Sequence, residues 1–216
     1  MKNRILNFSS LILFVFIVVC CSNDKFTLPY FNTAEFTPEW IDAKNLSSTK
    51  MHTIGNFSFI DQSGHTITNQ DFKDKIYLAN FFFTTCPSIC PQMTANMAKL
   101  QDIYRDDNRV KFLSHSVTPW IDTVEQLQRY AIEYRVIPDK WHLVTGDKAE
   151  IYDIARQSYF AEMEIGTQLT TDDFLHTENF ILVDANKHIR GIYNGTILSE
   201  IERIRDDISV LTFNGN

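Results

Sequence analysis

Hydrophobic and polar residues alternate along this chain with the periods of strands and helices. Residues 56–60 and 65–68 alternate with period two around a turn at 61–64, which predicts a β-hairpin. Residues 76–83 are almost continuously apolar, as in a strand buried on both faces. Further strands are predicted at 110–117, 141–144, 180–184 and 189–193. Apolar residues at helical spacing predict helices at 93–104, 123–134, 149–159 and 199–211.

Strands and helices therefore alternate, and a turn at 185–186 joins the last two strands. This order predicts an α/β fold, with a central mixed sheet, helices on both faces and an N-terminal hairpin. Residues 22–51 have no clear period and include Pro29 and Pro38, so we interpret 21–51 as a tether. Some of its aromatic residues are expected to dock on the domain, namely Phe31, Phe36 and Trp40.

The first residues look like a targeting segment. Lys2 and Arg4 precede a wholly apolar run at 11–19, which is too short for the roughly 18 residues that cross a bilayer. The run ends at two adjacent cysteines and resembles a bacterial lipoprotein signal. Cys21 follows the small Cys20 and is the preferred lipid site, while a plain cleaved signal peptide or a short anchor stays open.

The predicted organisation is thus a signal peptide at 1–20, a tether at 21–51 and a domain at 52–216. The lipid on Cys21 would anchor the domain to a membrane of the bacterial cell envelope, outside the cytoplasm. Whether this is the inner or the outer membrane stays open.

Length and composition narrow the class of protein. A chain of 216 residues fits one domain with a small appendage. The 17 Phe and 8 Tyr residues can bury a real core, which excludes disorder as the main description. A formal net charge of -7 argues against nucleic-acid binding, because that function needs a basic surface.

The other two cysteines carry the candidate chemistry. Cys86 and Cys90 lie between the apolar run and a predicted helix, where amide groups and the helix dipole favour thiolates. Pro87 and Pro91 stiffen the loop, and we expect both sulfur atoms on one side of a helical turn and exposed. Two thiolates suit Cu(I) and also Zn(II), and the same pair can form a disulfide. The alternative is that Cys86 and Cys90 are two buried cysteines without a chemical role.

A family resemblance enters at this motif. The run Cys86-Pro-Ser-Ile-Cys90-Pro91 resembles the signature of the SCO/SenC family, copper-binding proteins with a thioredoxin-like fold that help assemble the binuclear copper centre of cytochrome c oxidase. Similar segments at 116–123, 141–147 and 176–184 extend the resemblance over about 53–211. It implies a thioredoxin-like fold and a copper site, for Cu(I) and also Cu(II), formed by Cys86, Cys90 and His176. The implied recipient is the copper-binding subunit of cytochrome c oxidase or another copper protein.

The chain departs from the family pattern at three places. Leu175 stands where the family usually has Asp before the histidine, although Asp172 and Asp173 lie near. Thr118-Pro119 replaces an Asp-Pro pair, and Thr123-Val124 replaces Thr-Pro. These positions surround the expected ligands and do not include them, so the ligand prediction is unchanged.

The remaining histidines and nearby methionines are interpreted as structural. His115 lies within a predicted strand and His142 beside Trp141, so both favour core positions. The surface or hairpin histidines are His52, His65 and His188, and His188 is kept as a backup ligand. Met93 and Met97 follow Cys90 at helical spacing, which is more typical of core than of copper ligands.

A second function uses the same cysteine pair without metal. In a dedicated thiol–disulfide oxidoreductase Cys86 would attack and Cys90 would resolve. The chain has three residues between the cysteines, where a thioredoxin has two, and no proline follows Pro138, which weakens a general activity. A peroxidase of the peroxiredoxin type wants Pro and Thr where Ala79 and Phe83 stand, so we discount it.

Overall fold

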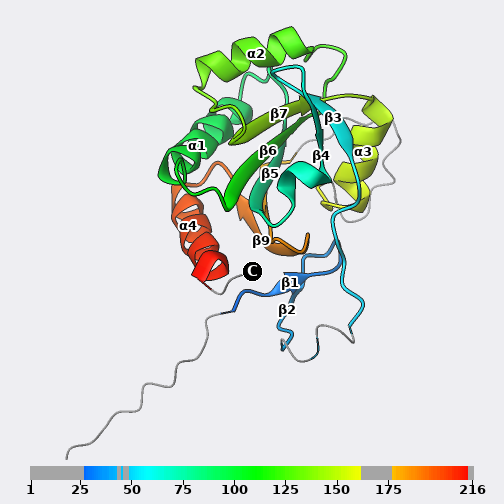
Figure 1. Ribbon diagram of the computed structural model, residues 1–216, viewed down its shortest axis with the longest axis vertical. Coiled ribbons are helices and arrows are strands. Elements are labelled where there is room, and N and C mark those ends of the chain that lie inside the picture. Colours follow the sequence, from blue (N-terminus) through cyan, green and yellow to red (C-terminus); the bar gives the residue numbers. More distant parts are fainter. Residues whose placement is uncertain (1–26, 43–44, 46–48, 162–176, 214–216) are drawn as a thin grey trace, which may run out of the picture.

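The computed structural model describes residues 27–42, 45, 49–161 and 177–213. Within these residues a seven-stranded mixed sheet has the strand order β4-β3-β7-β6-β5-β8-β9 (Figure 1). The strands are β3 (Ser58–Asp61), β4 (Thr66–Thr68), β5 (Ile76–Phe82), β6 (Val110–Ser116), β7 (Trp141–Thr145), β8 (Asn179–Val183) and β9 (Ile189–Asn194). The predicted mixed α/β fold with an N-terminal hairpin, here β3 and β4, is confirmed.

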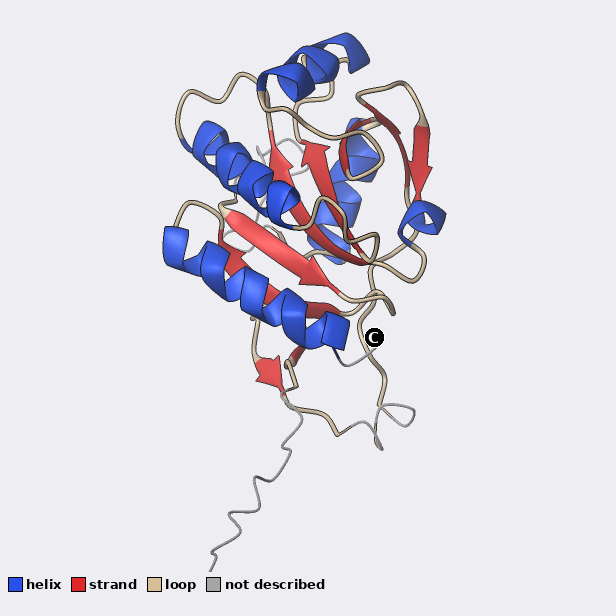
Figure 2. Cartoon of the chain, turned by 60° about the vertical axis from the view of Figure 1, so that its left-hand side comes forward, coloured by secondary structure: helices blue, strands red, loops and turns tan. Residues whose placement is uncertain are grey.

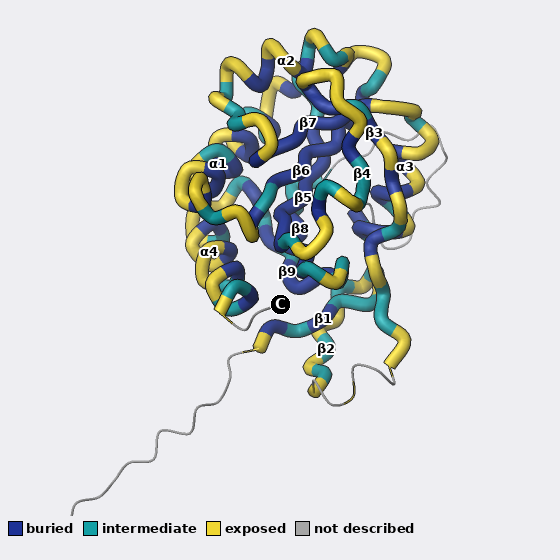
Figure 3. The backbone as a smooth tube through the Cα atoms, viewed as in Figure 1, coloured by how far each residue is buried: buried dark blue, intermediate teal, exposed yellow. Residues whose placement is uncertain are grey.

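Helices cover both faces of the sheet (Figure 2). The α-helices are α1 (Ile89–Ile103), α2 (Val124–Glu133), α3 (Lys148–Gln157) and α4 (Leu198–Phe213), and a 3-10 helix, η2, covers Asn69–Phe72. Apolar residues of α1, α2 and α4 share one core cluster with one face of the sheet. Residues of α3 form a second cluster on the other face, together with aromatic residues of the hairpin. The buried strands between exposed helix surfaces are visible in Figure 3.

Strand β5 lies in the middle of this arrangement and is buried along its whole length. Leu78 and Phe82 pack with the α1, α2 and α4 side, whereas Tyr77 and Phe81 pack with the α3 side. The continuous apolar run of the sequence thus reflects burial on both faces, as predicted.

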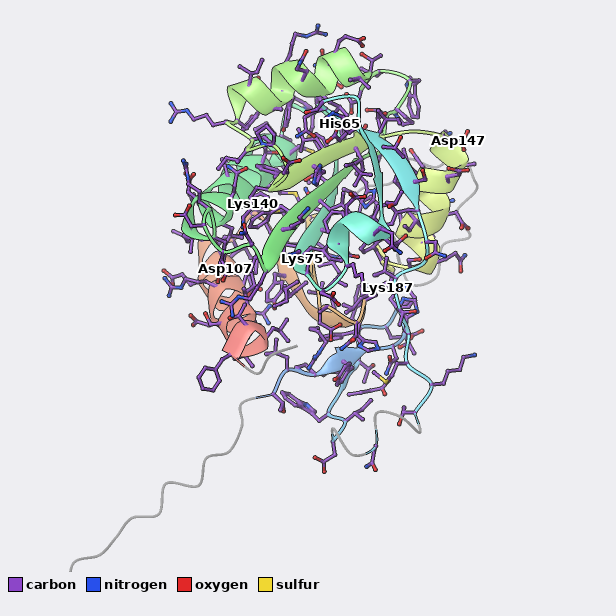
Figure 4. The ribbon with its side chains drawn as sticks, in the orientation of Figure 1. His65, Lys75, Asp107, Lys140, Asp147 and Lys187 are labelled. Atoms are coloured by element: carbon purple, nitrogen blue, oxygen red, sulfur yellow. The ribbon has the colours of Figure 1, made fainter. Side chains whose placement is uncertain are left out.

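Strand directions place several loops at one edge of the sheet. β5 is parallel to β6, and β6 is parallel to β7. β8 is antiparallel to β5 and β9 is antiparallel to β8, so β9 runs in the direction of β5. We call the edge where β5, β6, β7 and β9 end the carboxyl edge. In Figure 4, Lys75 and Lys140 mark the amino ends of β5 and β7, and Asp147 marks the carboxyl edge beyond β7.

Two predictions need correction. Helix α1 begins at Ile89, four residues before the predicted start at 93, and so includes Pro91. The first four amides of a helix have no partner within the helix, so a proline there loses no hydrogen bond. Trp40 is exposed and does not dock, whereas Phe36 packs its ring against that of Phe160.

Part of the segment interpreted as a tether packs against the opposite end of the domain. It forms two short antiparallel strands, β1 (Tyr30–Phe31) and β2 (Pro38–Glu39), and β1 lies beside β9 (Figure 1). The Arg190 guanidinium donates hydrogen bonds to the backbone oxygens of Leu28 and Pro29 and forms an ion pair with Asp184. None of the helices in the described ranges combines the length and apolar content needed to span a bilayer.

Candidate metal and thiol site

Both candidate cysteines lie at the carboxyl edge, where β5 gives way to α1. Cys86 is in the loop before α1, and Cys90 is the second residue of the helix. The two residues are 7% and 4% exposed, so the expected exposure was wrong. They also do not share a helical turn, because Cys86 precedes the helix. Each side chain nevertheless affects the pKa of the other, and among the described residues both are free cysteines.

Amides at the start of α1 influence the pKa of Cys86. The N-cap residue Ser88 makes no side-chain hydrogen bond to the helix. The backbone amides of Cys90, Ser88 and Ile89 instead favour the thiolate of Cys86. Burial on its own raises the pKa of the Cys86 thiol, but these amides and the Cys90 side chain outweigh it and lower the pKa below its ordinary value of 9.0.

Cys90 has the opposite character. Burial raises the pKa of its thiol from 9.0 to about 12, and the negative charges of Cys86 and Asp122 act in the same direction. The pair therefore holds a thiolate-prone sulfur next to one that keeps its proton. Such a pair suits a nucleophile with a resolving thiol, and it also suits two soft ligands that a metal ion would deprotonate.

A buried carboxylate that sequence reasoning missed lies behind the thiol loop. Asp122 is fully buried and accepts hydrogen bonds from the hydroxyl groups of Ser116, Thr118 and Thr84. In the sequence, Asp122 lies in the segment 116–123, which resembles the SCO/SenC family, but the sequence alone predicted no role for this residue. Its partner Thr84 lies 38 residues away along the chain, so periodicity gives no signal for the contact.

The structure separates the other predicted residues. His176 lies outside the described residues, so its position relative to the cysteines stays a prediction. His188 lies in the β8–β9 turn, next to the start of β5, and this removes it as a backup ligand. Met93 and Met97 are fully buried core residues, as expected.

The two central histidines are structural. His142 is buried and its Nδ1 lies 3.0 Å from Asp61 Oδ2. His115 is enclosed by aromatic rings, and neither of its ring nitrogens has a hydrogen-bond partner among the described residues; these rings belong to Phe57, Phe59, Phe81 and Tyr159. Burial lowers the pKa of His115 from 6.5 to about 3, so the ring is neutral near pH 7.

The donor set fits a thiophilic cargo ion. Two adjacent sulfur atoms are available, and one of them is readily ionised. Within the described part of the chain, no group of three or more His, Cys, Asp or Glu side chains could hold a metal ion. His176, the predicted third ligand, lies outside that part.

The loops around the thiols are uncharged. Three segments meet at the carboxyl edge, 84–91, 117–121 and 195–199, and none contains Asp, Glu, Lys or Arg. The Gln92 amide donates to the Thr196 carbonyl, which ties the third segment to α1. Large apolar side chains are exposed on both flanking segments: Trp120, Ile121, Ile197 and Leu198. In a chain of net charge -7, these three segments offer apolar contact without charges of their own, whereas Asp147 and Lys148 follow β7 at the same edge and Lys148 Nζ lies 5.5 Å from the centroid of the Trp120 ring.

Comparison with known proteins decides the family. A sequence model of the SCO1/SenC family matches residues 46–212. The chain belongs to the SCO1/SenC family. Its fold resembles that of a SCO1/SenC family lipoprotein from Bacillus anthracis strain Ames, with a TM-score of 0.66 and 29% identity; the match covers 74% of this chain and 95% of the other.

Two further SCO1/SenC structures bear on the chemistry. BsSco, described with a disulfide switch and as a member of the Sco family of cytochrome c oxidase assembly proteins, has a TM-score of 0.62 and 32% identity over 74% of this chain and 94% of its own. ScoI of Bradyrhizobium japonicum, solved with copper bound, has a TM-score of 0.58 and 25% identity over 74% of this chain and 99% of its own.

Proposed function

We propose that this SCO1/SenC protein binds copper through Cys86, Cys90 and His176 and delivers it to the copper-binding subunit of cytochrome c oxidase or to another copper protein. The observation that carries the proposal is the pair of adjacent sulfur atoms at the carboxyl edge, one of them with a lowered pKa. Soft thiolates favour Cu(I), and an imidazole completes a three-coordinate site. The copper-bound relative supports the choice of metal.

Transfer would proceed by exchange of ligands. Thiolates or imidazoles of the recipient would replace the three ligands one at a time, while copper keeps its oxidation state. The recipient's thiols release protons as they bind, and Cys90 takes one back. Because both sulfurs are nearly buried, the recipient must contact the loops around them, and the exposed side chains Trp120 and Leu198 offer that contact.

Copper titration of the reduced protein tests the site. Wild-type protein should bind about one equivalent of Cu(I) tightly, and Cys86→Ser, Cys90→Ser and His176→Ala should each weaken binding by a large factor. His188→Ala is the matched control, because this histidine lies at the other end of β5. Unchanged Cu(I) affinity in the Cys86→Ser protein would remove the proposed site.

The second candidate is a dedicated thiol–disulfide oxidoreductase, favoured by the contact between two sulfurs of unlike pKa. The Cys86 thiolate would attack a partner disulfide, and one partner sulfur would leave as a thiolate. Cys90 would then lose its proton, attack Cys86 and release the second partner sulfur. The pair loses two electrons and the partner gains them. Rapid turnover of many disulfides by metal-free protein would displace the copper proposal.

The cellular role can be separated from both chemistries. Deletion of this protein should lower cytochrome c oxidase activity, and added copper should restore it if metal delivery is the function. Loss that copper does not restore would favour thiol reduction, and unchanged oxidase would indicate another partner.

For localisation, we propose the organisation 1–20, 21–51 and 52–216, with lipid on Cys21 and the domain outside the cytoplasm. The Bacillus anthracis relative, which is named a lipoprotein, supports this. Cys21→Ala should release the protein from membrane fractions, with Cys20→Ala as control.

A further inference from the structure

We propose that Asp122 is the positioning residue of the thiol pair: acting through Thr84, it holds the loop before α1 in the conformation in which the Cys86 and Cys90 sulfur atoms are adjacent. This inference deepens the proposed function and rests on it for the copper arm of its test. The alkylation rate of metal-free Cys86 tests the inference independently of copper, because the loop positions the thiols in the same way without metal.

The Asp122 carboxylate is buried in the protein. Asp122 is fully buried, although it follows a loop with exposed apolar residues. A buried carboxylate is stable only when its oxygens are well hydrogen-bonded. Asp122 meets this condition, because it accepts hydrogen bonds from Thr84 in the loop before α1 and from Ser116 and Thr118 at the end of β6. These contacts fix the position of its carboxylate.

The two carboxylate oxygens of Asp122 accept hydrogen bonds from different hydroxyl groups. Oδ1 accepts from Thr84 Oγ1 at 2.5 Å. Oδ2 accepts from Ser116 Oγ at 2.5 Å and from Thr118 Oγ1 at 2.9 Å. The Thr84 amide lies 3.4 and 3.3 Å from the two oxygens. One oxygen therefore faces the thiol loop, and the other faces the loop after β6.

Helices α2 and α3 hold the residues around Asp122 in place. The Tyr152 hydroxyl, from α3, donates to the Val117 carbonyl at 3.0 Å. The Gln126 amide, from α2, donates to Thr84 Oγ1 at 3.1 Å. The network thus fixes Thr84 relative to helices on both faces of the sheet.

A tight turn connects Thr84 with Cys86. Thr84 lies two residues before Cys86, and the Cys86 amide donates to the Phe83 carbonyl at 3.3 Å in the same tight turn. A shift of Thr84 would therefore move Cys86 away from the α1 amides and from Cys90. Residues that orient metal ligands in this way typically change affinity by about 10–100-fold when they are altered.

The test uses two substitutions that each remove one 2.5 Å hydroxyl contact from the same carboxylate. Thr84→Val breaks the contact on the thiol loop, whereas Ser116→Ala breaks the contact on β6. If Asp122 positions the thiols, Thr84→Val should weaken Cu(I) binding in competition with bicinchoninic acid by about tenfold or more. It should also change the alkylation rate of metal-free Cys86 by iodoacetamide. Ser116→Ala should leave both near wild type, although it too lowers the melting temperature.

Two further variants cover the failure of Thr84→Val to fold. Thr84→Ser keeps the hydroxyl group and should restore wild-type affinity and alkylation rate. Gln126→Ala removes the outer support of Thr84, together with an exposed contact to Arg129, and should produce a smaller change of both readouts in the same direction. Equal behaviour of Thr84→Val and Ser116→Ala, or a Gln126→Ala protein identical to wild type where Thr84→Val does not fold, would overturn the inference. Wild-type protein that binds no Cu(I) would refute the proposed function, while the alkylation rates would still decide this one.

Discussion

Cys86 and Cys90 each affect the pKa of the other, and their surroundings move the two pKa values in opposite directions. Amides at the start of α1 favour the Cys86 thiolate, whereas burial keeps Cys90 protonated with a pKa of about 12. Since the thiolate is the reactive form, the two cysteines should differ strongly in reactivity near neutral pH.

We therefore expect iodoacetamide to modify Cys86 before Cys90 in the reduced, metal-free protein at pH 7–8. Peptide mapping by mass spectrometry at short reaction times should find the label almost entirely on Cys86. In Cys86→Ser protein, Cys90 should react much more slowly than Cys86 does in Cys90→Ser protein. Equal labelling rates in the two single variants would contradict the asymmetry.

The amides that favour the Cys86 thiolate also lead to a prediction about stability, because they would make the sulfur a cap of α1. Removing an N-cap acceptor typically costs about 1 kcal/mol, and Ser is itself a good acceptor. Cys86→Ala should therefore lower the free energy of unfolding more than Cys86→Ser does, by about 1 kcal/mol. Urea unfolding followed by circular dichroism measures both. If the two variants have the same stability, the sulfur does not cap α1.

Arg190 provides the clearest test of how the N-terminal segment is held. Its guanidinium pairs with buried Asp184 and lies 3.8 Å above the centroid of the Tyr30 ring. Arg190→Met leaves the Asp184 carboxylate without its guanidinium partner, and breaking a buried pair in this way costs about 3–5 kcal/mol. We expect a large drop in melting temperature and early proteolysis near Leu28. The double variant Arg190→Met/Asp184→Asn should recover part of the stability, and no recovery would mean that the ion pair is not the cause.

His115 should make the fold sensitive to acid. Its pKa is depressed to about 3 in the folded chain, while the unfolded value is near 6.5. Above pH 6.5 the ring is neutral in both states, so its contribution to stability is fully present. As the pH falls from 6.5 toward 3, only the unfolded state gains the proton, and stability is lost by up to about 1.4 kcal/mol per pH unit.

Unfolding in urea between pH 4 and 8 tests this effect. His115→Leu cannot be protonated, so its stability should fall less steeply than that of wild type below pH 6.5. His65→Leu is a suitable control, because His65 is exposed. Parallel pH profiles for wild type and His115→Leu would show that another group controls the acid sensitivity.

Local patterns predicted most of the architecture because burial follows periodicity: β5 is apolar throughout since both of its faces are covered. The cysteine pair was also recognisable, because its prolines and its position between strand and helix are local features. The role of Asp122 was not, since its contact with Thr84 spans 38 residues and depends on how β5 and β6 end side by side. The early start of α1 was missed because Pro91 normally argues against a helix.

The three uncharged segments around the thiols lead to a last prediction, which concerns copper transfer rather than copper binding. Trp120 and Leu198 are exposed on segments that flank the thiol loop, and neither contacts Asp122 through a side-chain hydrogen bond in the described residues. Leu198→Lys and Trp120→Glu place charges where an apolar partner surface would dock, so each should slow copper transfer to the recipient domain while Cu(I) affinity stays unchanged. Because apolar contact is little screened, transfer by wild type should also vary little between low and high salt. Ile132→Lys is the matched control, since Ile132 is equally apolar and exposed but belongs to α2, beyond the flanking segments. If Ile132→Lys slows transfer as much as Leu198→Lys, or if salt abolishes transfer by wild type, the recipient does not recognise this edge by apolar contact.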